Sequence, residues 1–181
     1  MKTPLHGIAK RFFEYLGRHI PQQCASDEFY FLPRSETAIQ FLDSLDPLSE
    51  EKVQDHIRYV RGLLNELPRE EMDDLEQEID RRFLKQGMES FIREYEDAEV
   101  WRRDPTLYVK IPLFAIESCL SQEITPPRGM KDHLFSILNQ IPGFLSLALQ
   151  NLRFPSEISI QVASDMAGDA VHFHRLSLIH I

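Results

Sequence analysis

The fold is decided by residues 69–120, which read REEMDDLEQEIDRRFLKQGMESFIREYEDAEVWRRDPTLYVKIPLFAIESCL. In the first half of this stretch apolar residues recur mostly at spacings of three or four, as one buried face of an α-helix requires. This apolar stripe consists of Met72, Leu75, Ile79, Phe83, Met88, Phe91 and Tyr95. Acidic residues fill most positions between them, so we expect a long helix with one side in the core and an acidic side in solvent. The alternative use of the acidic side is as a site for a cation or a basic partner.

A second helix is predicted to begin at Asp104-Pro105, because the aspartate can cap free N–H groups and a proline in the first turn loses no hydrogen bond. Pro112 lies further along, so the helix either kinks there or starts near Ile111, and we favour the kink. Trp101 and Tyr108 flank the helix start, and each combines a large apolar ring with one polar atom. We expect this pair to pack across a corner between two helices, and stacking against a ligand is the alternative.

The residues before this stretch predict an amphipathic helix and then a loop. Residues 5–20 place Leu5, Ile8, Phe12, Leu16 and Ile20 on one helical face. We expect that face to dock on the rest of the domain, with a position on a membrane surface as the alternative. Residues 21–36 are predicted to form a loop that the aromatic cluster Phe29-Tyr30-Phe31 holds against the domain. The alternative is that this cluster forms a binding edge.

A short helix is expected at residues 37–45, followed by a longer one that pairs with the acidic helix. Ser49 is a candidate N-cap for the longer helix. Pro68 separates the two long helices, so we expect them to form an antiparallel pair. The apolar face of the first of them consists of Val53, Ile57, Val60, Leu64 and Leu67.

Two more helices are expected after residue 120. Residues 124–129 form the clearest loop of the chain. The next helix runs to about Leu152 and bends at Pro142, where the proline deletes one backbone hydrogen bond but the apolar phase continues. Pro155-Ser156 ends that helix and caps the last one, whose small-residue face is Ile160, Ala163, Met166, Ala167, Ala170 and Val171. Because no alternating strand pattern competes, we predict an all-α fold, a multi-helix bundle of antiparallel and bent helices.

Composition limits the classes of function. The chain has 181 residues, 43% of them hydrophobic, and a net charge of −9 that is concentrated in residues 26–100. The sequence contains no basic patch large enough to bind along a phosphate backbone, so we expect no nucleic-acid partner. No apolar run is long enough to span a membrane, and no signal peptide is visible at the N-terminus. We expect Cys24 and Cys119 to be reduced, buried thiols, which fits a cytoplasmic protein.

The sequence contains none of the common catalytic motifs. There is no Gly-rich phosphate loop, no Gly-x-Ser-x-Gly turn and no His-Glu-x-x-His helix. His172 and His174 are the only close histidine pair, and two residues apart on a helix they point about 200° from each other. We therefore assign no catalytic, cofactor-binding or metal-binding residue to this chain.

Two segments, about thirty residues apart, resemble the N-terminal half of the bacterial domain-of-unknown-function 885 family. That family has an Asp/Asn-Pro-x-x-Tyr segment followed by a helix with Ile-Pro-x-x-Leu-x-x-Ala and a later leucine. The matching residues are Asp104-Pro105-Thr106-Leu107-Tyr108 and Ile141-Pro142-Gly143-Phe144-Leu145-Ser146-Leu147-Ala148, with Leu152. The resemblance covers roughly residues 35–170.

The resemblance implies a large helical protein similar to zinc metallopeptidases of the gluzincin type. The family's zinc-binding helix lies far downstream, so no metal ligand or catalytic base is carried over. The chain would then form one wall of the substrate cleft, with the missing C-terminal half of the same protein as its partner and a peptide as the substrate of the full-length enzyme. The alternative is a self-contained helical interaction module that uses its acidic face.

We expect the domain to be residues 1–175, a fragment of the larger protein. Residues 176–181, Leu-Ser-Leu-Ile-His-Ile, match one reading frame of the transposon mosaic end used in sequencing libraries, so we expect them to be a non-native tail. A fragment should leave an apolar patch on the last two helices, and we expect Met166, Val171 and Phe173 within it.

Overall fold

The computed structural model describes residues 4–69, 71–120 and 129–178, apart from the side chains of Met130 and of residues 173–178. All regular elements in these ranges are helical, which confirms the all-α prediction. The predicted loop at residues 124–129 lies outside the described residues except for Gly129.

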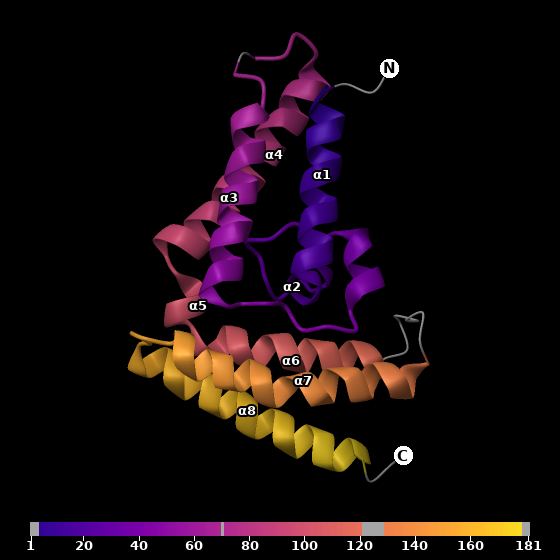
Figure 1. Ribbon diagram of the computed structural model, residues 1–181, viewed down its shortest axis with the longest axis vertical. Helices are drawn as coiled ribbons and strands as arrows, with labels where there is room; N and C mark the ends of the chain where they lie inside the picture. The colour runs from indigo at the N-terminus through magenta and orange to yellow at the C-terminus, as the bar shows by residue number, and fades with distance from the viewer. Residues whose placement is uncertain (1–3, 70, 121–128, 179–181) are drawn as a thin grey trace.

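The helices form two layers (Figure 1). The upper layer is a bundle of α1 (Pro4–His19), α3 (Glu50–Glu66) and α4 (Leu75–Ile92), which run along the long axis of the molecule. The lower layer crosses beneath it and consists of α6 (Pro105–Leu120), α7 (Met130–Asn151) and α8 (Glu157–Leu178). Both α7 and α8 pack against α6.

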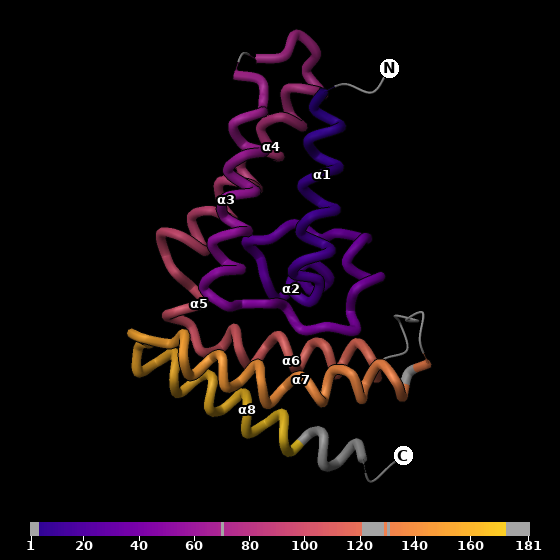
Figure 2. Tube along the Cα trace, in the orientation of Figure 1, coloured from indigo at the N-terminus to yellow at the C-terminus, as the bar shows by residue number. Residues whose placement is uncertain are grey.

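Short elements fill the space between the layers. The trace in Figure 2 shows α2 (Pro21–Ala25) and the 3-10 helix η1 (Glu36–Phe41) lying beside the lower end of α1. The predicted short helix at residues 37–45 is thus a 3-10 helix, and α2 occupies the start of the predicted loop. The aromatic cluster pins this region as expected, because Phe29 is buried and the ring of Phe31 packs against Tyr95.

The N-terminal helix docks on the bundle as predicted. Its face of Leu5, Ile8, Phe12 and Leu16 is buried in the common core, and α1 packs against α3, α4 and η1. None of the described helices is both long and apolar enough to cross a membrane.

Helices α3 and α4 form the predicted antiparallel pair. Ser49 caps α3 by accepting a hydrogen bond from the backbone N–H of Lys52. The buried face of α3 includes Val53, Ile57 and Val60, with Leu63 in place of the expected Leu64, which is half-buried.

The prediction for the first half of α4 was wrong. Leu75, Ile79 and Phe83 are 73%, 44% and 71% exposed, whereas Leu84 and Met88 are buried. The step from Phe83 to Met88 is five residues, which rotates the stripe by about 140° on a helix of 3.6 residues per turn. The two apolar runs therefore lie on different faces, and only the later one faces the core.

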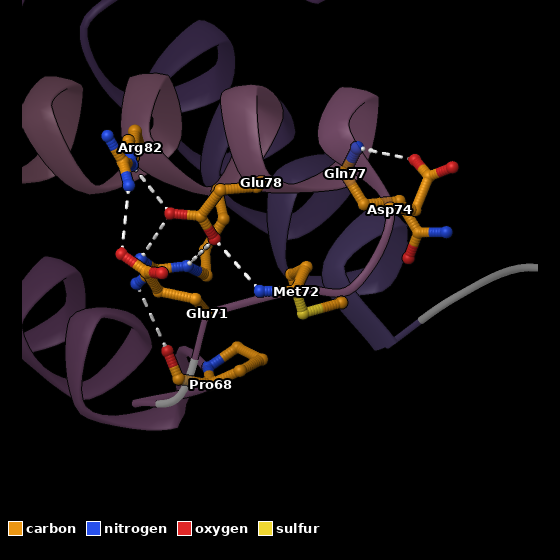
Figure 3. Close-up of polar contacts among 8 residues, drawn as sticks. Pro68, Glu71, Met72, Asp74, Gln77, Glu78 and Arg82 are labelled. Carbon is orange, nitrogen blue, oxygen red and sulfur yellow. Dashed lines mark hydrogen bonds and ion pairs between the residues drawn. The ribbon is translucent and has the colours of Figure 1, made fainter.

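In place of the expected apolar side chains, an ion-pair cluster occupies the buried side of α4 near its start (Figure 3). Glu78 accepts hydrogen bonds from Arg81 Nε and Nη2, from Arg82 Nε and from the backbone N–H of Met72. Arg81 also donates to the carbonyl of Pro68, at 3.3 Å. The cluster thus ties the connection between α3 and α4 to the first turns of α4.

Replacing Glu78 with glutamine should lower the melting temperature at neutral pH. Hydrogen bonds from Arg81, then Arg82 and the Met72 N–H, hold the pKa of Glu78 below its ordinary value of 4.5. The stabilisation is therefore complete above that value and is lost as the pH falls through the lowered pKa. Thermal unfolding across acidic pH should show the gap between wild type and Glu78→Gln closing, while the control Glu76→Gln stays close to wild type throughout. A gap that does not change with pH would contradict this account.

The two proline-containing helices are continuous: α7 as its apolar phase predicted, and α6 from the predicted start at Pro105 and not from near Ile111. Helix α6 begins at Pro105 and includes Pro112, and Asp104 accepts from the backbone N–H of Thr106 at its start. Helix α7 includes Pro142. Ser156 caps α8 by accepting from the backbone N–H of Ser159.

Candidate functional site

The most highly connected polar site is a buried chain of hydrogen bonds between the two layers, which we call the joint network. It consists of Gln23, Asp46, Tyr95, Trp101, Tyr108 and Asn151, all of them buried.

The network begins at Asp46, whose carboxylate caps the start of α2. It accepts hydrogen bonds from the backbone N–H groups of Gln22 and Gln23, at 2.9 and 3.0 Å, and from Gln23 Nε2 at 2.9 Å. Burial raises the pKa of Asp46 to about 7, although these three donors act in the opposite direction. The carboxylate has no exposed surface, so its role is to satisfy donors inside the protein.

From Gln23 the network passes to the end of the upper bundle. Tyr95 donates its hydroxyl to Gln23 Oε1 at 2.6 Å, and its carbonyl accepts from Trp101 Nε1 at 3.0 Å. Tyr95 lies in the π-helical turn Arg93–Asp97 that follows α4, and Trp101 lies in the short helix α5 (Val100–Arg103). This irregular backbone turns the chain from one layer to the other.

The network ends in the lower layer. Tyr108 on α6 donates to the carbonyl of Trp101 at 2.5 Å, and Asn151 at the end of α7 donates to the Tyr108 hydroxyl at 2.9 Å. Asn151 also donates to the carbonyl of Leu48, just before α3, at 2.7 Å. Every step joins segments that are distant in sequence or lie in different helices.

Trp101 and Tyr108 therefore form the predicted helix corner. Both rings are buried, so neither offers a face to a ligand, and the ligand-stacking alternative is wrong. The guanidinium of Arg102 lies 4.3 Å from the centre of the Trp101 ring and pairs with Glu50 at the start of α3. The corner is a structural joint between α5 and α6.

Helix α7 also holds the segment before α3 by a second group of polar contacts. Ser136 Oγ and Gln140 Nε2 donate to the carbonyl of Asp43, and Gln140 Oε1 accepts from the backbone N–H of Leu45. Sequence reasoning missed these residues and Asp46. The signal was available in part, because Gln140 and Asn151 are uncharged polar residues on or beside the apolar stripe of α7.

A small pocket of about 210 Å³ lies between α1 and α3, and sequence reasoning missed it as well. Tyr15 stacks on Tyr59 with ring centres 3.7 Å apart, and its hydroxyl lies 2.9 Å from Nδ1 of His56. Burial lowers the pKa of His56 to about 4, so this imidazole is neutral at physiological pH. The pocket is lined by Arg11, Glu14, Tyr15, Arg18, His19 and Tyr59.

The described cysteine and histidine side chains that the sequence singled out do not come together in a site. Cys24 and Cys119 are free, buried thiols as predicted, and burial raises the pKa of both. His172 is exposed on α8, and the side chain of His174 lies outside the described residues. Within the described part of the chain, no three potential metal ligands come together.

An apolar surface on α7 is the other prominent feature. Phe135, Leu138, Leu145 and Leu149 lie within about 80° of one another around the helix axis and are exposed, Leu149 by 82%. We call these four residues the outer stripe. No Asp, Glu, Lys or Arg occurs between Asp132 and Arg153, so this side of α7 is uncharged over most of its length.

Apolar side chains are also exposed in the following segment, as expected for the last two helices. Val171 is exposed, Met166 is half-buried, and the side chain of Phe173 lies outside the described residues. The further exposed apolar residues are Phe154, Ile158, Ile160 and Val162. On α8, Ile158 and Val162 lie on a different side from Ile160 and Val171, so these residues do not form one surface. The outer stripe does, and an exposed apolar surface of this kind marks an interaction site more often than a solvated face.

No family model, no curated protein and no solved structure matches the chain.

Proposed function

We propose that this chain is the N-terminal helical portion of a larger bacterial, cytoplasmic protein that resembles zinc metallopeptidases. In that protein it forms one wall of the substrate cleft and takes no part in the chemical step. Its partner is the C-terminal half of the same protein, which supplies the zinc ligands and acts on a peptide.

The observation that carries this proposal is the outer stripe. Four large apolar side chains on one uncharged side of α7 are exposed to water, although the opposite side of the same helix is well packed through Ile137 and Phe144. Leaving such side chains exposed forgoes roughly 1.5–3 kcal/mol for each one that could be buried. Packing against a further helical segment would recover that free energy.

The position of the family-like residues supports the same role. Tyr108 belongs to the joint network, and its ring centre lies 5.5 Å from that of Phe144, so the two segments that carry the resemblance contact each other where α6 packs against α7. A wall of a cleft requires rigidity, because a substrate is positioned only by elements that do not move relative to each other.

The double variant Leu145→Gln/Leu149→Gln tests the outer stripe. We expect its free energy of unfolding to stay within about 0.5 kcal/mol of wild type, because both side chains already contact water. We also expect it to bind less of an apolar fluorescent dye and to self-associate less in sedimentation experiments.

The matched control is Phe144→Gln, which places the same side chain on the buried side of the same helix. It should destabilise the protein by about 3 kcal/mol or more. If the Leu145→Gln/Leu149→Gln variant were destabilised as strongly as this control, or if its dye binding were unchanged, the outer stripe would not be an unpaired docking face.

A further inference from the structure

A second surface lies at the opposite end of the molecule from the lower layer, where α1 and α4 run side by side (Figure 1). It contains a pocket of about 360 Å³. Its lining comes from two helices: Leu5, His6 and Ala9 from α1, and Gln77, Asp80, Phe83 and Leu84 from α4. The pocket is large enough for one or two apolar side chains.

An exposed apolar strip leads along α4 beside this pocket. Leu75, Ile79 and Phe83 follow one another at intervals of four residues, and all three are exposed. On an α-helix they form a strip about 12 Å long, which corresponds to two turns. Phe83 belongs to both the strip and the pocket, so the strip leads to the edge of the pocket.

Several carboxylates lie at the start of α4 near this surface, and one of them, Asp80, lines the pocket together with the polar residues His6 and Gln77. Asp73, Asp74, Glu76 and Asp80 are exposed at the start of α4. Among the described residues no lysine or arginine lines the pocket. The nearby cations Arg81 and Arg82 are held by Glu78, and Arg82 also pairs with Glu71.

We propose that this surface, which we call the α1/α4 groove, binds a basic amphipathic helix of another protein. Apolar residues of the partner, spaced by three or four, would enter the pocket and cover the strip of α4. Its Lys or Arg residues would face the carboxylates of Asp73, Glu76 and Asp80. This mode is helix-in-groove recognition, with charge complementarity that selects a basic partner over an acidic one.

The inference goes beyond the proposed function, because it concerns the other end of the molecule. The outer stripe lies in the lower layer and the α1/α4 groove in the upper layer, so both can be occupied at once (Figure 1). An experiment can therefore contradict the proposal for one surface and leave the proposal for the other unaffected.

The test is a titration of the whole chain, labelled with ¹⁵N, with two synthetic amphipathic helices of about five turns. One peptide is built from leucine and lysine, and the other has the same pattern of leucine with glutamate. The lysine peptide should shift the amide signals of Leu5, Ala9, Phe83 and Leu84 saturably, and its affinity should fall as salt is added. The glutamate peptide should bind at least about tenfold more weakly.

Two variants and one control make the test specific. Phe83→Ser should weaken binding of the lysine peptide about tenfold, as loss of a central apolar anchor does. Asp80→Asn should weaken it about threefold and reduce its salt dependence. Leu149→Ser, on the outer stripe, should leave the affinity unchanged. Phe83 and Leu149 are both largely exposed, so thermal unfolding should show that these variants remain folded.

Three results would overturn the proposal. One is equal binding of the two peptides, and another is an unchanged affinity of folded Phe83→Ser. The third is a set of shifts confined to α7 and α8, which would show that the lysine peptide occupies the outer stripe instead of the α1/α4 groove.

Discussion

Replacing Asp46 with alanine should lower the free energy of unfolding by about 3 kcal/mol or more, because each buried donor left without a partner costs at least ~1 kcal/mol. Three donors lose their acceptor: the backbone N–H groups of Gln22 and Gln23, and the side-chain amide of Gln23. Denaturant unfolding measures the loss. The control Asp73→Ala removes an exposed carboxylate and should change stability by no more than about 0.5 kcal/mol. A loss that small for Asp46→Ala would show that the joint network does not hold α2 in place.

The same carboxylate should give the protein an unusual pH dependence. Burial raises the pKa of Asp46 from 3.8 to about 7, so the folded state binds its proton more tightly than the unfolded chain. The contribution of Asp46 to stability therefore decreases as the pH rises between these two values. His56 acts in the opposite direction, because burial lowers its pKa from 6.5 to about 4 and the unfolded chain binds the extra proton.

A difference measurement separates the two groups. The quantity to measure is the free energy of unfolding of wild type minus that of Asp46→Asn, because the contribution of His56 is the same in both proteins and cancels. This difference should decrease as the pH is raised from 3.8 to about 7. A difference that increased with pH would mean that the three donors outweigh burial and keep this carboxylate charged.

The second large effect is expected at Trp101. Trp101→Ala should destabilise the protein by about 3–5 kcal/mol, as truncation of a fully buried aromatic residue does. The variant also leaves the carbonyl of Tyr95 without its donor and removes the ring beneath Arg102. The milder Trp101→Phe keeps most of the apolar volume but loses the indole N–H, so it should cost about 1–3 kcal/mol.

Circular dichroism during denaturant unfolding measures both variants, with Tyr30→Ala as the control. The Tyr30 side chain is 88% exposed, and its removal should change stability by no more than about 0.5 kcal/mol. If Trp101→Ala unfolded at the same denaturant concentration as Tyr30→Ala, the corner would not be the element that joins the two layers.

The helices were predictable wherever the apolar phase was regular. The faces of α1 and α3, the start of α6 at Pro105 and the continuity of α7 through Pro142 all follow from local spacing and capping. These features depend on the helical period and on backbone hydrogen bonds, and both can be read from neighbouring residues.

The face of α4 was predicted wrongly because the five-residue step across Gly87 was treated as a continuation of one stripe. Two apolar runs out of phase leave two possible buried faces, and tertiary packing decides between them. Here the later run with Leu84 and Met88 packs in the core, and the ion pair of Glu78 with Arg81 takes the inner side of the first turns. Reading the rotation at that step would have shown that the two runs lie on different faces, but not which of them is exposed.

The joint network could be predicted only in part. The Trp101 and Tyr108 corner follows from the ring chemistry and the helix start between them. Asp46 and Asn151 could not be assigned, because their partners lie 23 or more residues away. A polar residue that satisfies distant backbone groups leaves no periodic pattern in the chain.

The proposal that residues 176–181 are a non-native tail stays a prediction, because the structure does not bear on the origin of this segment. The codons of that segment test it. Codons other than CTG TCT CTT ATA CAC ATC would remove the mosaic-end explanation.

The most direct test of the proposed role is to read the native gene past the codon for Arg175. The account predicts an open reading frame that continues for a further helical half and encodes His-Glu-x-x-His-type zinc ligands. A native gene that keeps residues 176–181 and then stops would contradict it.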